Sequence, residues 1–201
     1  MPEIEIKFAV PDPARLEELA ALARVGPYSV VGRREVEQSD TYYDTPSREA
    51  AAAGGSVRER RRDGGTLYTL KGCPSSDDVP RRDEVEEPAD GRELREWVRE
   101  VLASGRVSLR LEPDSLERVL EIRNRRTLLD LETDAGDAAE MALDRLTYVG
   151  PRGEAREREV ELELKSGDPA RLREAGRWLE TERGLARSRT GKYRRALETV
   201  G

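Results

Sequence analysis

The sequence predicts an α+β fold: a closed, eight-stranded antiparallel β-barrel with flanking helices. Several segments alternate strictly between polar and apolar residues, which is typical of half-buried strands. Short turns rich in Gly and Asp join many of these segments, and such turns favour hairpins. Helical patterns lie between the strands. Closing the sheet would remove the exposed edges that so many amphipathic strands otherwise present.

The elements expected in the first half of the chain follow from local patterns. Ile4, Ile6 and Phe8 alternate with charged residues, so the chain opens with a strand. Asp12 can cap a helix that has Pro13 at its first position. The full set is a strand over 3–8, a helix over 13–24, a strand over 30–43, a short helix over 47–53, a hairpin over 56–62 and 66–72, a loop over 74–80 and a strand over 81–87.

In the second half, Asp168 and Gly184 mark the beginning and the end of a helix. We find no internal repeat and no second domain, so residues 1–201 are expected to form one domain. The expected elements are a helix over 91–102, a short helical piece after Asp114, strands over 118–126, 127–133, 139–148 and 155–165, a helix over 169–183, and a helical turn around 191–193.

The composition excludes several classes of function. The chain has 201 residues, of which 39% are charged, a net charge of −6 and no histidine. The missing histidine excludes histidine bases, Ser-His-Asp triads and His-ligated zinc, and the negative charge argues against nucleic-acid binding. Cys73 is the only cysteine, so no intrachain disulfide can form. There is no signal-peptide pattern and no apolar run of ~20 residues, so we expect a cytoplasmic protein with no membrane partner.

The polar faces of the expected strands complement one another in charge. For any single strand, a solvated outer face would also explain the alternation. Together the faces would line one lumen, where divalent metal would relieve the repulsion between carboxylates and Arg and Lys would bind phosphate oxygens. The groups are Glu3, Glu5 and Lys7; Ser56, Arg58, Arg60 and Arg62; Thr69 and Lys71; Arg82, Glu84 and Glu86; Glu121, Arg123, Arg125 and Thr127; Asp144; and Glu157, Glu159, Glu161, Glu163 and Lys165.

The chain resembles the CYTH family, which unites class IV adenylyl cyclases with thiamine triphosphatases and inorganic triphosphatases. A single short charged motif occurs by chance in many proteins, but this sequence carries seven motifs in the same order as the family, which makes the resemblance specific. Many relatives carry a C-terminal helical CHAD domain, which we do not predict within these residues. The matching motifs are Glu3-Ile-Glu-Ile-Lys7, Tyr42-Tyr-Asp-Thr45, Arg58-Glu-Arg60, Thr69-Leu-Lys-Gly72, Arg82-Asp-Glu-Val-Glu86, Asp144 with Glu161-Leu-Glu163, and Ser188-Arg-Thr-Gly-Lys192-Tyr193.

The resemblance implies a tunnel that binds a small-molecule triphosphate with Mg²⁺ or Mn²⁺. Alternation along the strand near 123–126 turns Arg123 and Arg125 inward and Arg126 outward. Glu84 and Glu86 would bind metal or orient the cations, and Glu157 and Glu159 are expected to extend into solvent. The implied metal ligands are Glu3, Glu5, Asp144, Glu161 and Glu163. The implied phosphate contacts are Lys7, Arg58, Arg60, Lys71 and Lys192, with one further arginine from the strand near 123–126.

We therefore expect a triphosphatase that cleaves inorganic triphosphate to pyrophosphate and phosphate, with Glu5, Glu161 and Lys192 in the catalytic group. Lys192 would stabilise negative charge, or act as an acid–base group if neighbouring arginines depress its pKa. Two alternatives stay open: a class IV adenylyl cyclase making cyclic AMP from ATP, and a polyphosphate- or nucleotide-binding module without turnover. The sequence leaves four points undecided: the natural substrate, the preferred metal, a homodimer, and which of Arg123, Arg125 or Arg126 faces the tunnel.

Overall fold

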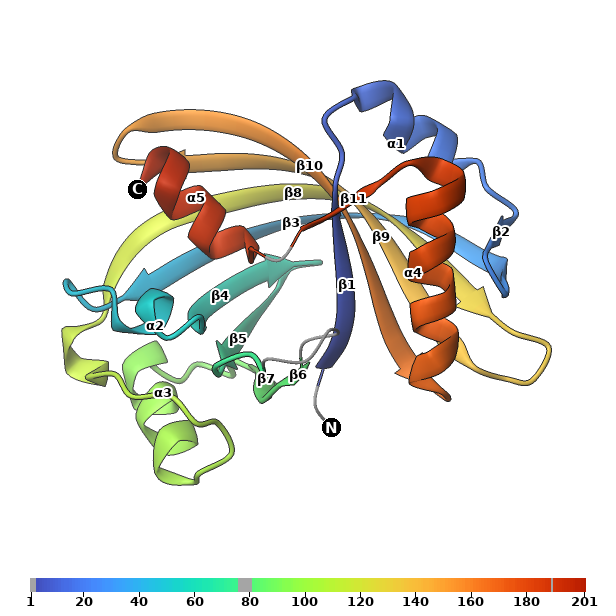
Figure 1. The fold of residues 1–201 in the computed structure, drawn as a ribbon. Helices are drawn as coiled ribbons and strands as arrows, with labels where there is room; N and C mark the ends of the chain where they lie inside the picture. The colour runs from blue at the N-terminus through green and yellow to red at the C-terminus, as the bar shows by residue number, and fades with distance from the viewer. Residues whose placement is uncertain (1–2, 76–80, 189) are drawn as a thin grey trace.

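A computed structural model of the chain describes residues 3–75, 81–188 and 190–201. The described strands join in one curved antiparallel sheet of eleven strands with helices around it, which confirms the α+β class (Figure 1). The strands are β1 (Glu3–Ala9), β2 (Arg24–Val25), β3 (Tyr28–Asp44), β4 (Ser56–Arg62), β5 (Gly65–Lys71), β6 (Arg81–Arg82), β7 (Glu84–Pro88), β8 (Glu117–Glu132), β9 (Ala138–Gly150), β10 (Gly153–Ser166) and β11 (Ala186–Ser188). The helices are α1 (Pro13–Ala20), α2 (Glu49–Ala52), α3 (Leu94–Ala103), α4 (Pro169–Arg183) and α5 (Lys192–Val200), with a 3-10 turn, η1, at Pro113–Ser115.

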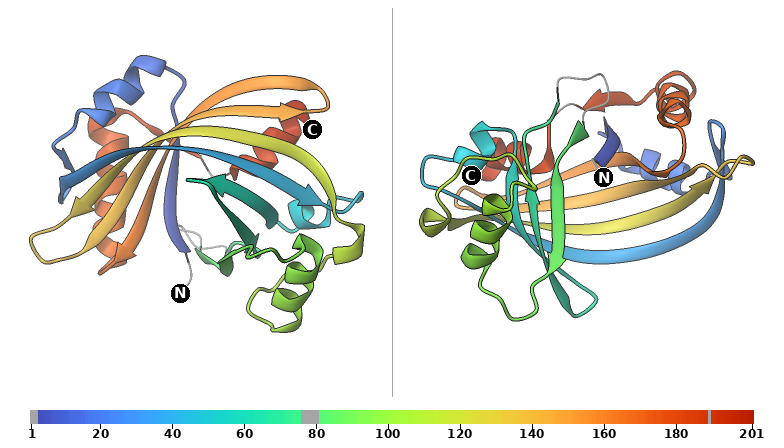
Figure 2. Two further views of the ribbon diagram at one scale, coloured as in Figure 1. Left: turned by 180° about the vertical axis from the view of Figure 1, so that it is seen from behind. Right: turned by 90° about the horizontal axis from the view of Figure 1, so that it is seen from below.

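The expected closed barrel of eight strands is wrong. The sheet runs in the order β11-β1-β10-β9-β8-β3-β4-β5-β7, so β1 and β7 do not pair. Within the described ranges, the link across this gap is the short β6, whose Arg81 and Arg82 pair with Ile4 and Glu3 of β1. β3 and β8 have 17 and 16 residues, whereas β1, β4 and β5 have seven each. The short strands cover only part of the long ones, and the sheet stays open along the remainder (Figure 2).

A single strand, β8, takes the place of two expected strands. We expected a break between residues 126 and 127, but β8 runs unbroken from Glu117 to Glu132. It pairs with β3 on one side and with β9 on the other. Pairing on both sides holds the backbone extended, and neither Arg126 nor Thr127 is among the residues that favour turns.

Helices cover opposite faces of the long strands at their two ends. α1 and α4 pack at one end, in a cluster that includes Leu129 of β8. α5 packs at the other end, in a cluster that includes Ile122 of the same strand. Odd- and even-numbered residues of a strand point to opposite faces, so the two helix layers lie on opposite sides of the sheet. Figure 1 shows α4 and α5 far apart along the strands.

Two helices begin as their sequences predict, and α4 also ends as predicted, whereas α1 ends at Ala20 rather than at the expected residue 24. Asp12 accepts a hydrogen bond from the Ala14 N–H at 2.9 Å, and Asp168 accepts one from the Ala170 N–H at 2.8 Å. These bonds satisfy N–H groups that have no partner inside α1 and α4. Gly184 ends α4 in the left-handed region, with a φ of 63°.

The last helix is longer than the single turn that we expected. α5 has nine residues, because Tyr193, Ala196 and Val200 give it an apolar face that the sheet buries. α3 packs in a third cluster, against Val57 of β4 and Leu70 of β5. Over the ranges that the structure describes, no helix combines the length and the apolar character needed to cross a bilayer.

Candidate active site

One face of the curved sheet carries a continuous row of charged and polar residues. The register places Lys7 opposite Glu161, and Asp144 opposite both Glu159 and Arg126. Residues directly opposite in an antiparallel pair share a face, so the row continues from strand to strand. We call this row the charged face. It comprises Glu5, Lys7, Asp40, Arg58, Arg60, Thr69, Lys71, Glu84, Glu86, Asn124, Arg126, Asp144, Glu159, Glu161 and Glu163.

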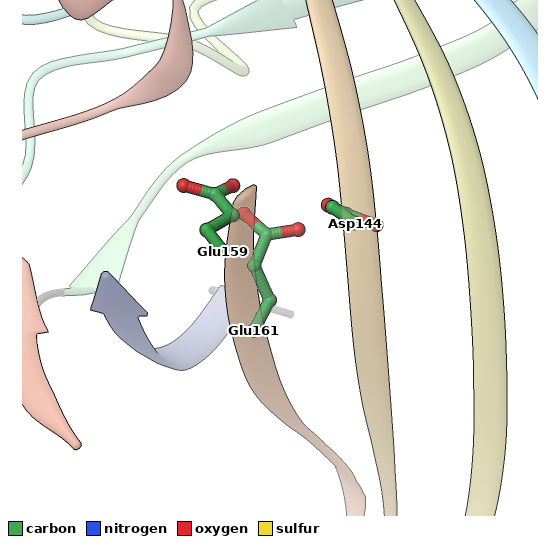
Figure 3. A group of neighbouring side chains, drawn as sticks. All are labelled: Asp144, Glu159 and Glu161. Atoms are coloured by element: carbon green, nitrogen blue, oxygen red, sulfur yellow. The ribbon is translucent and has the colours of Figure 1, made fainter. Parts of the chain in front are cut away.

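Three carboxylates of the charged face form what we call the acidic cluster: Asp144, Glu159 and Glu161. They point toward one another from β9 and β10, and one oxygen of each lies within 4.8 Å of the others (Figure 3). Alternation along β10 puts Glu159 and Glu161 on one face, and the register brings Asp144 opposite Glu159. Two neighbouring strands therefore suffice to assemble the cluster.

Lys192, the first residue of α5, lies between all three carboxylates. Its Nζ is 2.6 Å from Asp144, 2.9 Å from Glu159 and 2.7 Å from Glu161. Arg126 of β8 approaches from the other side and donates to Asp144 at 2.7 Å and to Glu161 at 2.8 Å. A helix and a strand that are distant in sequence thus supply the countercharge.

Two further cations contact the same carboxylates. Lys7 of β1 lies 3.5 Å from Glu161 and 2.7 Å from Glu5. Arg195, one turn after Lys192 in α5, forms an ion pair with Glu159. The negative charge of the cluster is therefore compensated by residues from β1, β8 and α5.

The pKa values of the site follow from this balance of burial and charge. Burial lowers the pKa of Lys192, but the acidic cluster outweighs burial and holds that pKa well above its ordinary value. Burial raises the pKa of Glu161, but Lys192, Lys7 and Arg126 reverse this and hold it well below the ordinary value. At Glu159 burial prevails over Lys192, and the pKa is raised. Of the two roles expected for Lys192, these contacts favour stabilisation of negative charge, which stays a prediction.

The acidic cluster fits a hard divalent cation. Mg²⁺ and Mn²⁺ prefer carboxylate oxygens, and the cluster offers one from each of three residues. The Oε1 atom of Glu159 is buried, and Lys192 Nζ lies 2.9 Å from it as an ion pair rather than as a hydrogen bond. A divalent cation in place of the ammonium would satisfy this oxygen. Asp144, Glu159 and Glu161 are the residues that would hold it.

A second group, which we call the basic cluster, consists of Arg58, Arg60 and Lys71 on β4 and β5. Arg60 donates to both oxygens of Asp40, at 2.8 and 2.9 Å. Arg58 lies 3.5 Å from Asp40 and donates to the Thr69 hydroxyl at 3.0 Å. The guanidinium groups are thereby held in fixed orientations on the charged face.

Glu84 and Glu86 of β7 lie beside the basic cluster rather than in the acidic one. Glu84 is 3.0 Å from Lys71, and Glu86 is 3.1 Å from Arg58. Of the two roles that we expected for these carboxylates, the contacts favour orienting the cations.

Asp40 is absent from the residues that we expected in the site. Burial raises its pKa, but Arg58 and Arg60 outweigh burial and the pKa is lowered. Lys192 adds to this effect, so Asp40 experiences the charges of both clusters. Alternation along β3 does place Asp40 on one face with Gln38 and Tyr42, but the sequence does not show that this is the charged face.

The expected orientation of the arginines in β8 is reversed. The side chains of Arg123 and Arg125 are 57% and 61% exposed, on the face opposite the charged face. Arg126 is 13% exposed and contacts the acidic cluster. The sequence of β8 could not show which of its faces points toward the site, because both faces carry buried apolar residues, such as Ile122 and Leu129.

Other predicted residues divide between the site and its margin. Glu5 is buried beside Lys7. Glu163 lies on the same face of the sheet, but its side chain is 35% exposed and pairs with Lys165 at 2.7 Å. The Glu3 side chain lies outside the described part of the structure. The expectation that Glu159 extends into solvent is wrong, because it is 1% exposed.

α5 is anchored by a contact next to Lys192. The Tyr193 hydroxyl donates to Asp44 at 2.9 Å, and its ring stacks on Tyr42 with 4.8 Å between ring centres. Asp44 also accepts hydrogen bonds from the N–H groups of Ala50 and Ala51 at the start of α2. This anchor fixes the first turn of α5 over the charged face.

Comparisons with known proteins show the family and agree with the fold. The CYTH domain family matches residues 1–197. Among solved structures, HpAC1 from Hippeastrum, described as an adenylyl cyclase candidate with a dominant triphosphatase activity, is 20% identical with a TM-score of 0.67, covering 98% of this chain and 95% of that one. An adenylate cyclase candidate from Bacillus halodurans is 16% identical with a TM-score of 0.64, covering 96% of each chain. The PH1819 protein from Pyrococcus horikoshii is 19% identical with a TM-score of 0.58, covering 98% of each. A comparison with curated proteins finds no significant match.

Proposed function

This chain belongs to the CYTH family of triphosphatases and class IV adenylyl cyclases, and from that premise we propose that it is a metal-dependent hydrolase of inorganic triphosphate. The observation that carries the proposal is the presence of the acidic cluster and the basic cluster on one charged face. A polyanion that binds together with a divalent cation needs both. Sugars and lipids need neither.

The acidic residues of the site would bind the metal, and the basic residues would bind the triphosphate. The acidic cluster would hold the cation, which supplies polarisation of a phosphoryl oxygen and activation of water. Arg58, Arg60 and Lys71 would bind phosphate oxygens, the two arginines in the orientation that Asp40 gives them. Lys192 and Arg126 would stabilise the negative charge that spreads over the transferred phosphoryl group. Proton transfer would fall to water, because the acidic cluster before binding and a triphosphate after binding would both favour the charged form of Lys192.

The packing of the aromatic residues supports inorganic triphosphate over ATP. The chain has nine aromatic residues, and all of them pack in or against the three apolar clusters. Tyr42 and Tyr148 are buried in the apolar cluster against α5, and Tyr193 belongs to α5 and is buried in the same cluster. A cyclase must hold adenine, and stacking on an aromatic ring is a common means of doing so. No aromatic ring in the described ranges is left for that purpose.

The test is a substrate panel of inorganic triphosphate, ATP and thiamine triphosphate, each with Mg²⁺ or Mn²⁺. We expect phosphate release to be fastest with inorganic triphosphate and to stop when a chelator removes the metal. Formation of cyclic AMP from ATP would replace the proposal by the cyclase. Calorimetric binding of triphosphate without phosphate release would replace it by a binding module.

A further inference from the structure

We propose that Lys192 occupies the metal position of the metal-free protein, so that a divalent cation binds tightly only when a triphosphate draws Lys192 away. The inference rests on the proposed function, because it assigns the acidic cluster to a metal. It concerns the order and the coupling of binding, which the presence of the cluster alone does not determine.

The first step is the position of the ammonium group. Lys192 Nζ contacts all three members of the acidic cluster, at 2.6 to 2.9 Å. The contact with Glu161 is a hydrogen bond, and the contacts with Asp144 and Glu159 are ion pairs. The oxygens that it contacts belong to the residues that would bind the metal. A metal ion cannot occupy the position among the three carboxylates while the ammonium nitrogen fills it, because the two would overlap and their charges would repel.

The second step is that the lysine side chain can leave while its helix stays. Lys192 is the first residue of α5, and its four-carbon stem is flexible. The helix is held independently by the Tyr193–Asp44 hydrogen bond and by the burial of Ala196 and Val200. Arg126 differs in this respect. A forked contact to Asp144, a further hydrogen bond to Glu161 and the pairing of β8 on both sides fix it in place.

The third step is the destination of the displaced charge. Withdrawing Lys192 into water would leave three close carboxylates with less compensation, so a metal must offset that loss. A bound triphosphate supplies a new anionic partner for the ammonium. Triphosphate should therefore raise metal affinity through Lys192. By linkage, metal should raise triphosphate affinity by the same factor.

The experiment measures Mn²⁺ binding directly, from the electron paramagnetic resonance signal of free Mn²⁺, with and without a non-hydrolysable imido analogue of triphosphate. For the unaltered protein we expect the analogue to tighten Mn²⁺ binding. In Lys192→Met we expect Mn²⁺ binding without the analogue to tighten at least about tenfold, and the enhancement by the analogue to shrink by a similar factor. Direct coordination of Mn²⁺ by the analogue accounts for the enhancement that remains.

The matched control is Arg194→Gln. Arg194 lies two residues further along α5, is largely exposed and pairs with Glu198 at 3.2 Å, so its loss should leave Mn²⁺ binding unchanged. Equal or weaker Mn²⁺ binding by a folded Lys192→Met protein would overturn the inference. If that variant does not fold without metal, Lys192→Gln keeps a polar group at the position, and thermal melting with and without Mn²⁺ gives a second measure. The gain in melting temperature from Mn²⁺ should be larger in the variant than in the unaltered protein.

The two proposals fail in different ways. Tighter Mn²⁺ binding by Lys192→Met with no phosphate release from any triphosphate would keep the inference and remove the hydrolase. Metal-dependent phosphate release with Mn²⁺ affinity unaffected by Lys192 would keep the hydrolase and remove the inference.

Discussion

The two halves of the charged face compensate their charges in opposite ways. In the acidic cluster the carboxylates lie on β9 and β10, and a cation from helix α5, Lys192, lies among them. In the basic cluster the cations lie on β4 and β5, and the carboxylates that hold them, such as Asp40, come from neighbouring strands. The acidic cluster receives part of its opposite charge from the first residue of a helix. The basic cluster receives its opposite charge from strands of the sheet.

Under our proposal, this difference separates an acidic cluster that exchanges Lys192 for a metal from a basic cluster that holds its groups still. Lys192 is the first residue of α5, so its flexible side chain would leave the cluster without moving the backbone. An arginine that is held by two hydrogen bonds to a buried aspartate is already oriented for a planar phosphate contact. Substitutions in the first half should therefore change metal binding and turnover. Substitutions in the second half should also change stability.

The largest expected effect is that of Glu161→Gln in the acidic cluster. Removing one anionic metal ligand while keeping the side-chain shape should lower the rate of phosphate release by about 10³-fold or more, because metal contributes several kcal/mol to such reactions. Circular dichroism should show an unchanged fold. Glu18→Gln on the exposed face of α1 is the control. Near-normal turnover in Glu161→Gln would mean that the cluster is not the metal site.

A smaller loss is expected from the basic half. Arg58→Met should lower kcat/KM for triphosphate by about 10²-fold, the usual loss when one preorganised donor to a developing charge is removed. The matched control is Arg61→Met on the same strand, whose side chain is 73% exposed on the opposite face. An equal loss of activity in both variants would show that the effect of Arg58 does not depend on its position on the charged face.

The next effect concerns stability rather than turnover: Asp40→Asn, beside the basic cluster, should lower the free energy of unfolding. This change removes the buried carboxylate of Arg60, which is also the most deeply buried charge beside Arg58, although Arg58 keeps its ion pair with Glu86, and the expected loss is about 3 kcal/mol. The pKa of Asp40 is lowered in the folded protein, so its stabilisation is present above its ordinary value of 3.8 and is lost as the pH falls below it. Urea unfolding of both proteins should show the gap at pH 7 and its narrowing below pH 3.8. Asp130→Asn, at a more exposed ion pair with Arg34, should show a much smaller gap.

The smallest effect is expected outside the charged face, at Glu87. This carboxylate accepts hydrogen bonds from Arg106 at 2.7 Å and from the Trp97 indole at 2.9 Å, and these lower its pKa to about 2. Glu87→Gln should cost about 1–2 kcal/mol of stability at neutral pH, through loss of charged hydrogen bonds that attach α3. Because the folded pKa is lowered, that contribution is lost as the pH falls from 4.5 toward 2. Turnover should not change, and a large loss of activity would show that α3 also supports the site.

Local patterns in the sequence determined most of the strands and the chemistry of their polar sides. Strict alternation located β1 and β10, and the turn at 63–65 located the β4–β5 hairpin. The same alternation placed Lys7, Arg58, Arg60, Lys71 and Glu161 on shared polar faces, and the register confirms this placement. Their catalytic and binding roles stay predictions until turnover is measured.

Only the tertiary structure decided which face of each strand becomes the site. A two-residue period is the same for either face, so β8 alone could not show that Arg126 rather than Arg123 points inward. Helices from distant parts of the chain cover opposite faces of β8 at its two ends. This packing determines which side chains of β8 point toward the site. The burial of Glu159 depends in the same way on α5, and the position of Lys192 among three carboxylates depends on the docking of that helix. Contacts between segments far apart in the chain decide these features, because burial is a property of the assembled neighbours and not of the local sequence.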